Sequence, residues 1–345
     1  MIRLRVHAGE LPRYICPVDV ALDLPSDARV VLYQQPGNRP RACQLEPANA
    51  GCRLHWLVPR LPAGTTQDYL VDIKPERRRP VRRFRWQELS AHVVQLHLDG
   101  APVLDLDHDP ELKHPRLRIF RAGSAEPALE GIAVTSGLGH HSHHRTTVTT
   151  LETVSSGPAF AQVCFRGCWE TESALPILTE TRLLRCFATP KAIRLIHLAL
   201  HLQATAGPVK FETGPMASLL QFPVAPALRQ DPSLRVHDAV GIPGCDHASP
   251  WLHLQRDGWG LGILDHPCNP GSPCGWRIDS AVKANPWASL PRFAGLLPAV
   301  QPTLQVGEWL RFDYRIVLYE DQVRRGFVRA AYANFVKPPF VEVLD

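Results

Sequence analysis

The sequence predicts an all-β protein: a small N-terminal β-sandwich, a larger two-sheet sandwich after it, and one helix near the C-terminus. Short segments in which apolar and polar residues alternate recur along most of the chain, a pattern typical of half-buried strands. The 33 prolines and 23 glycines among the 345 residues supply turns between those segments. Apolar residues recur at helical spacing in one place only, close to the C-terminus. Together these features favour antiparallel β structure.

The first 90 residues are predicted to form the small sandwich. A proline-interrupted basic run from Lys74 to Arg85 follows its last strand and has the composition of a solvated linker. We therefore place a domain boundary near residue 90, with a second domain over residues 91–345. The candidate strands of the first domain are Val18–Leu22, Val30–Tyr33, Leu54–Val58 and Asp68–Asp72.

The second domain contains the clearest strand pattern. In Arg194–Ala204, leucines and isoleucines occupy every second position and would face a core, while His197 and His201 point the other way. A histidine on such a polar face is more often solvated or bonded to the backbone than functional. Trp251–Leu254 and Trp259–Leu264 flank an Asp-Gly turn, which predicts a hairpin whose second strand ends at Asp265 and His266.

Near the C-terminus the hydrophobic period changes. Leu310 to Leu318 alternates as a half-buried strand. Apolar residues then recur at helical spacing up to Phe335, with Asp321 as the predicted N-cap and Pro338-Pro339 as the stop. One amphipathic helix is therefore expected at this end of the chain.

The bulk composition excludes several classes of protein. No apolar run approaches the roughly 18 residues of a membrane helix, and the N-terminus lacks the apolar segment of a secretory signal, so we expect a cytoplasmic protein without a membrane partner. The basic run has no interleaved aromatics, so no nucleic-acid partner is expected. The nine cysteines lack zinc-site spacing, and most of them are predicted to be reduced. The oligomeric state stays open.

The densest polar feature is the His-rich stretch Gly139-His140-His141-Ser142-His143-His144-Arg145. Neutral imidazoles with a carboxylate such as Asp265 or Glu212 could hold a divalent transition metal. Alternatively, one imidazole could transfer a proton on a polar substrate while Arg145 binds a substrate oxygen. A loop that is merely solvated is the third possibility, and the residues alone leave all three open.

A second polar cluster, Asp265-His266-Pro267-Cys268-Asn269-Pro270, follows an apolar strand. A charged pair fixed by proline at a strand exit seldom has a packing reason, and tryptophans crowd this region as they do at sugar-binding clefts. We therefore expect the two clusters to meet in one pocket. The expected catalytic residues are His141, His143, His144, Asp265 and His266, and the expected substrate-binding residues are His114, His140, Arg145, Asn269 and Trp276.

These motifs, in this order, resemble a bacterial family that is often labelled "methane oxygenase PmoA", over about Leu96 to Phe335. The resembling segments are His114-Pro115, the His-rich stretch, Gly262 to Pro270, Trp276 and Asn285-Pro286. That family usually has Asp-His-Pro-His-His-Arg-Gly, and Gly139, Ser142 and Thr146 stand here in place of its Asp, Pro and final Gly. The resemblance implies a supersandwich similar to that of galactose mutarotase, whose concave face commonly handles carbohydrate.

The leading hypothesis is a carbohydrate-active protein that binds a small carbohydrate-like ligand. It would act on a sugar or sugar acid by His/Asp acid-base chemistry such as epimerisation, elimination or hydrolysis. A metal-dependent oxygenase, as the family label implies, is the first alternative, although a membrane methane monooxygenase would need membrane helices that this chain lacks. The second alternative is a sugar-binding module without catalytic activity.

Overall fold

The computed structural model describes most of the chain, and the description below concerns those residues only. The residues not described are 26, 74–82, 113, 123, 132, 135–143, 212–219, 226–227, 229–230, 232, 242–247, 257, 279–291, 297–302, 321–325 and 345. The described strands pair in antiparallel fashion throughout, and the all-β prediction is confirmed. Within these residues no helix is both long and apolar enough to cross a membrane.

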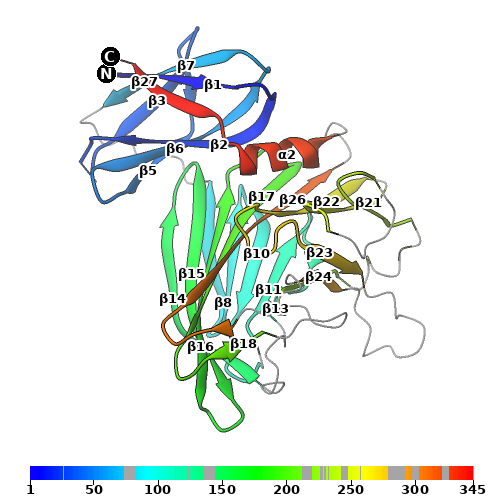
Figure 1. The fold of residues 1–345 in the computed structure, drawn as a ribbon. Helices are drawn as coiled ribbons and strands as arrows, with labels where there is room; N and C mark the ends of the chain where they lie inside the picture. Colours follow the sequence, from blue (N-terminus) through cyan, green and yellow to red (C-terminus); the bar gives the residue numbers. More distant parts are fainter. Residues whose placement is uncertain are drawn as a thin grey trace.

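Two small sheets form the N-terminal module, at the top of Figure 1. Leucines and valines from both sheets, with Trp56 and Tyr69, make a separate core between them. The first sheet has the order β27 (Phe340–Leu344), β1 (Ile2–His7), β7 (Thr66–Ile73), β3 (Val30–Gln34) and β4 (Arg39–Arg41). The second has the order β2 (Arg13–Leu22), β6 (Cys52–Leu61) and β5 (Cys43–Pro47).

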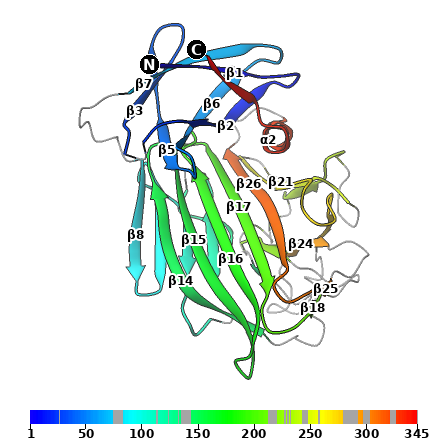
Figure 2. The ribbon, with the colours of Figure 1, turned by 60° about the vertical axis from the view of Figure 1, so that its left-hand side comes forward.

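The second module is built on an eight-stranded sheet, whose long strands lie side by side in Figure 2. Its order is β14 (His144–Ser156), β15 (Phe160–Thr171), β16 (Pro176–Phe187), β17 (Ile193–Ala204), β26 (Trp309–Glu320), β22 (Trp259–Asp265), β21 (Trp251–Arg256) and β20 (Arg235–His237). A five-stranded sheet faces it, with the order β12 (Pro127–Leu129), β11 (Arg116–Phe120), β10 (Ala101–Asp107), β9 (Val93–Leu98) and β8 (Phe84–Ser90).

Smaller sheets complete the second module. One has the order β13 (Ala133–Val134), β19 (Leu220–Pro223), β24 (Arg292–Leu296) and β23 (Gly275–Ile278), and the other pairs β18 (Val209–Lys210) with β25 (Thr303–Leu304). The main core lies between the facing sheets, because alternate residues of the long strands point into it. The large sheet therefore keeps a second, outer face. That face carries the odd-numbered residues of β17 and β26, among them His197, His201, Asp313 and Arg315.

The helix starts later than the sequence predicts. It is α2 (Phe327–Val336), with Gly326 as N-cap, so Asp321 does not cap it, and the predicted helical positions 321–325 lie outside the described residues. Gly326 has φ of 88°, a backbone conformation that few other residues adopt without strain. The helix ends at Val336, with Lys337 as C-cap, ahead of the Pro338-Pro339 pair, as expected. Figure 2 shows it beside β2 of the N-terminal module, and its apolar residues pack with Leu264 of β22 and Val317 of β26.

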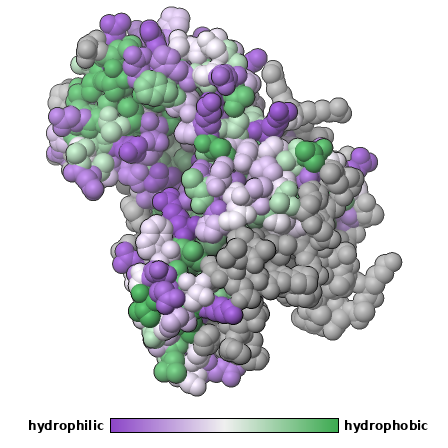
Figure 3. Space-filling model, viewed as in Figure 1, coloured by the Kyte–Doolittle hydropathy of each residue, from purple (hydrophilic) through white to green (hydrophobic). Residues whose placement is uncertain are grey.

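Strand pairing relates to the predicted boundary at residue 90 in two ways. β8, which ends at Ser90, pairs with β9 in the second module. β27 returns to the N-terminal module and pairs with β1, so the two chain ends lie together in Figure 1. In that view, hydrophilic residues gather where the two modules meet (Figure 3). The division at residue 90 remains a prediction, and the return of β27 to the N-terminal module was not part of it.

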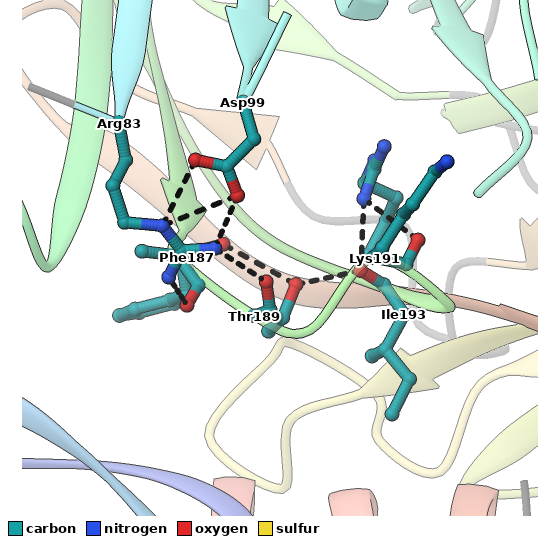
Figure 4. A network of polar contacts seen from close by, with 8 residues as sticks. Arg83, Asp99, Phe187, Thr189, Lys191 and Ile193 are labelled. Atoms are coloured by element: carbon teal, nitrogen blue, oxygen red, sulfur yellow. Dashed lines mark hydrogen bonds and ion pairs between the residues drawn. The ribbon is translucent and has the colours of Figure 1, made fainter. Parts of the chain in front are cut away.

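Arg83 connects the five-stranded and the eight-stranded sheet of the second module through hydrogen bonds, at the end nearest the N-terminal module (Figure 4). Its Nη1 donates a 2.8 Å hydrogen bond to the carbonyl of Ala188, its Nη2 a 3.2 Å bond to that of Thr189, and the guanidinium also pairs with Asp99. Asp99 belongs to the tight β9–β10 turn. The Thr189 hydroxyl donates to the carbonyl of Ile193 at 2.6 Å. The β16–β17 turn is thereby held to the opposite sheet.

Candidate functional site

Asp265, predicted to be catalytic, lies at the end of β22 and is completely buried. Its Oδ1 accepts a 2.7 Å hydrogen bond from Nδ2 of Asn269, and its Oδ2 accepts a 3.1 Å bond from the backbone N–H of Cys274. Both carboxylate oxygens are therefore used to fold the loop that follows the strand. This is the packing reason that the sequence analysis did not find.

Asn269 and Trp276, predicted to bind substrate, also have structural contacts. The side-chain amide of Asn269 mimics a backbone peptide: its Oδ1 accepts from the N–H of Asp313 at 2.6 Å, and its Nδ2 donates to the carbonyl of Asp313 at 2.8 Å. Trp276 is buried, and its Nε1 donates to the carbonyl of Ser249 at 2.6 Å. The Asn269 bonds hold the loop after β22 against β26, and the Trp276 bond joins β23 to the segment before β21.

His266 has a different environment, because it lines a cavity of about 310 Å³ between the two modules. The side chain is half-buried, and its Nδ1 accepts a 3.2 Å hydrogen bond from the N–H of Cys268. The proton of the neutral ring is therefore on Nε2. Burial is the main cause that lowers the pKa of His266 from its ordinary value. Its ring lies edge-on against Phe335 of α2, with centroids 4.8 Å apart.

The His-rich stretch can be placed only in part. Residues 135–143, which include His140, His141 and His143, lie outside the described residues, and of His144 only the backbone is described, as the first residue of β14. Arg145 is exposed, and its Nε lies 3.6 Å from Oε2 of Glu170 on the neighbouring strand. His114 lies beside β14, the strand of Arg145, and its Nδ1 is 3.0 Å from Oγ1 of Thr146. His114 and Arg145, two predicted substrate-binding residues, are thus near each other.

The structure does not bring Arg145 and Asp265 together. Each residue of the sheet has a directly opposite partner on the next strand. Following these partners from Asp265, strand by strand, gives Thr153 on β14, which is five strands away from β22. Five strand spacings amount to about 24 Å, and the eight residues from Thr153 back to Arg145 add about 26 Å along the strand. The expected single pocket is therefore not formed by the described members of the two clusters, because they occupy different strands and different levels of one sheet.

The outer face of the large sheet supplies the groups that surround His266 instead. Asp313 and Arg315 point outward from β26, and His197 points outward from the adjacent strand β17. The N-terminal module covers this part of the face with residues of β2 and β6, including His55 and Trp56, while Phe335 closes the side formed by α2. The cavity thus forms where three separate parts of the chain meet.

His197 and Asp313 form a pair within this cavity. The Nε2 of His197 lies 3.3 Å from Oδ1 of Asp313, and Arg311 holds the same carboxylate through Nε at 2.7 Å and Nη2 at 3.1 Å. Burial alone would raise the pKa of Asp313, but the bonds from His197 and Arg311 outweigh it and hold this pKa far below the ordinary value. Burial lowers the pKa of His197. At neutral pH the pair is therefore an ionised carboxylate beside a neutral imidazole.

A second charged cluster holds the N-terminal module onto the sheet beside the cavity. Glu46 of β5 accepts a 2.7 Å hydrogen bond from Nη2 of Arg185 and a 3.2 Å bond from Nε2 of Gln162, and His55 lies 2.9 Å from its other oxygen. The guanidinium of Arg185 also lies over the ring of Phe160, 4.3 Å from its centroid. The cavity thus has a fixed, polar wall on this side.

The outer face continues beyond the cavity to an exposed aromatic side chain. Trp309, at the start of β26, is 61 % exposed, and its ring stacks on His201 with centroids 5.9 Å apart and planes 17° apart. Trp309 and Asp313 share this face and are four residues apart on one strand, which corresponds to about 13 Å. An exposed indole at that distance is a flat apolar platform outside the polar cavity.

No metal centre can be assigned from the described residues, which contain no group of three His, Cys, Asp or Glu side chains placed to hold an ion. The transition-metal hypothesis rests on the histidines at 140, 141 and 143, which lie outside the described residues. It stays a prediction. The described cysteines form no disulfides.

The residues that complete the cavity carry no functional signal in the sequence. The alternating pattern places His197 on the side away from the core, where a histidine is expected to be solvated or bonded to the backbone. Asp313 and Arg315 appeared only as the polar positions of a strand. The alternating pattern does give their common face, but the pairing of β17 with β26, more than a hundred residues apart in sequence, is not visible in the pattern.

Comparisons with known proteins show a family but no activity. A model of a family of unknown function, DUF6807, matches residues 135–333, more than half of the chain. The match contains His197, His266, Asp313 and Arg315, whereas the residues of β2 and β6 lie outside it. No family under the label "methane oxygenase PmoA" is found. No curated protein matches the sequence.

Two solved structures from Enterococcus faecalis share the fold. One is a protein in glycosyl hydrolase family 38, with a TM-score of 0.52 and 8 % sequence identity, in which the alignment covers 100 % of this chain and 47 % of the other. The second is an alpha-mannosidase from strain V583, also with a TM-score of 0.52 and 8 % identity, with 100 % and 46 % coverage. The chain spans about half the length of these proteins, and the similarity at this identity concerns the fold alone.

Proposed function

This chain belongs to the family of unknown function DUF6807, and we propose that it binds a carbohydrate in the cavity between its two modules and acts on it by His/Asp acid-base chemistry. The observation that carries this proposal is the convergence of His197, Asp313 and His266 around one cavity. A volume of about 310 Å³ is at the lower end of the range for small-molecule pockets, roughly 300–1,000 Å³, and suits a ligand of monosaccharide size.

Each polar group has a distinct role in this proposal. Asp313 is ionised and faces Nε2 of His197, which favours the tautomer with the ring proton on Nε2 and the lone pair on Nδ1. Nδ1 of His197 is buried and has no hydrogen-bond partner among the described residues. It is the proposed base, with Asp313 orienting the ring as a carboxylate orients histidine in hydrolase triads. Nε2–H of His266 is the proposed donor to a sugar oxygen.

The surroundings of the pair support a sugar as the ligand. Phe335 and Phe187 supply aromatic side chains to the cavity, and Trp309 with His201 forms the exposed platform further along the same face. The solved proteins with a similar fold are a protein in glycosyl hydrolase family 38 and an alpha-mannosidase. Similarity of fold is an analogy, so the contacts of the cavity carry the proposal and the neighbours only agree with it.

The test uses a panel of neutral monosaccharides and their uronic acids in D2O, followed by proton NMR. Epimerisation exchanges a carbon-bound proton for deuterium, elimination produces a vinyl proton, and hydrolysis of a methyl glycoside releases methanol, so one method detects all three reactions. We expect His197→Gln and Asp313→Asn to lower the rate about 10²- to 10⁴-fold, the contribution of a positioned proton-transfer group, while ligand affinity changes only a few-fold.

The control is His92→Gln. His92 contacts His108 in the second module and does not line the cavity, so its substitution should leave rate and affinity unchanged. If the His197 and Asp313 variants turned over a substrate as fast as the parent, the acid-base assignment would be wrong. If no sugar of the panel bound at all, the carbohydrate proposal itself would fail.

A further inference from the structure

Arg315 is a buried cation without an anionic partner. It is 9 % exposed and lines the cavity, and its Nε is buried without a hydrogen bond. Within the described part of the chain, no ion pair or hydrogen bond of its guanidinium is found. The group is instead held by aromatic rings, with its central carbon 4.4 Å from the ring centroid of Phe335 and 5.8 Å from that of Phe187. Burial lowers the pKa of Arg315 to about 10, which leaves it charged at neutral pH.

The other charges around the cavity are already matched. Arg185 is paired with Glu46, Arg311 with Asp313, and Asp19 with Arg53. These pairs leave the charge of Arg315 without a counterpart on the described elements around the cavity.

The remaining titratable groups near Arg315 do not supply a negative charge. Cys16 of β2 interacts with it electrostatically, but burial raises the pKa of this thiol to about 12, so the thiol stays neutral. His197 and His266 are also neutral or positive, and Arg315 itself helps to lower the pKa of both, after the larger effect of burial. The carboxylate of Asp313, on the same strand, is held by Arg311 and His197.

We propose that Arg315 is the recognition site for a carboxylate group of the ligand, so that the cavity takes an acidic sugar, a uronate, in preference to a neutral one. An isolated buried charge is costly, and a ligand anion that pairs with it recovers that cost on binding. A guanidinium presents a planar fork that matches the two oxygens of a carboxylate. This inference rests on the proposed function, because it concerns the same cavity.

A carboxylate fits this cavity better than a phosphate does. A phosphate monoester carries close to two negative charges at neutral pH, whereas the cavity has one surplus cation and also contains the ionised Asp313. A second negative charge would lie near that carboxylate and be repelled. The flat carboxylate also matches the planar fork of the Arg315 guanidinium.

The experiment measures binding of D-glucuronate, D-galacturonate and D-mannuronate beside glucose, galactose and mannose, by calorimetry and by thermal unfolding, with acetate as a probe of the carboxylate alone. We expect at least one uronate to bind tenfold or more tightly than its neutral counterpart. That uronate should raise Tm, and the rise should grow with the logarithm of its concentration above Kd, since a ligand of the folded state stabilises it by mass action. Its affinity should weaken as salt is added.

The variants are Arg315→Met, which removes the charge but keeps an unbranched apolar side chain, and Arg315→Lys, which keeps the charge but loses the fork. Arg315→Met should lower uronate affinity tenfold or more, leave neutral-sugar affinity unchanged, and have a Tm equal to or above that of the parent without ligand, because an unpaired buried charge is gone. Arg315→Lys should lie between the two. The matched control is Arg194→Met, a buried arginine that does not line the cavity.

The outcomes separate this inference from the proposed function. Equal affinity of the wild type for uronates and neutral sugars would overturn the carboxylate site and leave the carbohydrate proposal standing. Binding of no sugar, together with a rise of Tm in acetate that Arg315→Met abolishes, would overturn the carbohydrate proposal and support the carboxylate site. Should Arg315→Met not fold, the preference of the wild type for uronates and its reduction in Arg315→Lys decide the question.

Discussion

His197 of β17 and Asp313 of β26 are diagonal neighbours on the outer face of the large sheet, with Nε2 and Oδ1 3.3 Å apart. Diagonal neighbours on paired strands are usually 7–8 Å apart at their backbones, a distance that a long polar side chain can bridge. The position of this pair is therefore set by the register of two central strands, which gives it a rigid support. Arg311 holds the carboxylate from the same strand.

The first prediction concerns the titration of His197. Burial lowers its pKa below the ordinary 6.5, while the bond to Asp313 raises it in part. Asp313→Asn removes the raising contribution, so the pKa of His197 should fall further in that variant. NMR titration of the imidazole protons gives both values, with exposed His201 as the internal comparison. A His197 that titrates at 6.5 or above in the wild type would contradict the burial argument.

Asp265 is predicted to matter for stability more than for chemistry. In Asp265→Asn, an NH2 group takes the place of one carboxylate oxygen. That NH2 group then faces an N–H donor, either the side-chain amide of Asn269 or the backbone of Cys274, and one hydrogen bond is lost. The loss of a buried hydrogen bond of this kind costs about 1–3 kcal/mol in the free energy of unfolding, which urea unfolding measures. A variant as stable as the parent but without turnover would instead assign Asp265 a direct role in the reaction.

The contrast between Asp265 and Asp313 shows how far the sequence predicts this site. Alternation along β17 and β26 correctly gave these strands and the side of the sheet that their residues face, while β22 was predicted from its apolar run and the turn before it. Asp265 was chosen because it stands after an apolar strand, a local feature that a loop-folding carboxylate shares with a catalytic one. Asp313 had no local signal, because its partner His197 comes from a strand distant in sequence.

Two features at the C-terminus also differ from the prediction, one for a local reason and one for a long-range reason. The apolar spacing of the helix continues back to residue 323, but the helix begins only after Gly326, whose positive φ interrupts the regular backbone. Phe340–Leu344 has the alternation of a strand, yet nothing in those five residues shows that they pair with β1 at the other end of the chain. Local patterns predict elements, and pairing over long distances decides the cavity and the module boundary.

Glu46 should make stability depend on pH in the acidic range. Burial alone would raise its pKa, but the bond from His55 and the charge of Arg185 lower it from 4.5 to about 2. Between these values the unfolded chain binds more protons than the folded one, so this contribution to stability is complete above pH 4.5 and is lost as the pH falls towards 2. Unfolding curves between pH 2 and 7 measure it.

The matched variant is Glu46→Gln, which keeps the shape of the side chain. It should reduce the free energy of unfolding at pH 7 by about 1–3 kcal/mol, since Arg185 loses a charged hydrogen-bond partner. Its stability should also vary less with pH across the acidic window. Parallel curves for Glu46→Gln and the wild type in that window would show that the ion pair at the module interface does not govern acid unfolding.

The last prediction concerns β27, which joins the chain's end to its beginning. Removal of residues 340–345 deletes the strand that pairs with β1 from Arg3 to His7, and it exposes an unpaired edge of the first sheet. Loss of the apolar contact of Val341 with the N-terminal core costs about 1.5 kcal/mol, and an open edge strand invites association with other chains. Amides of β1 should exchange with solvent faster, and light scattering should reveal association.

A chain that lacks only residue 345 is the control, and it should behave as the parent. If the longer deletion left the exchange of β1 unchanged, β27 would contribute nothing to the stability of the N-terminal module.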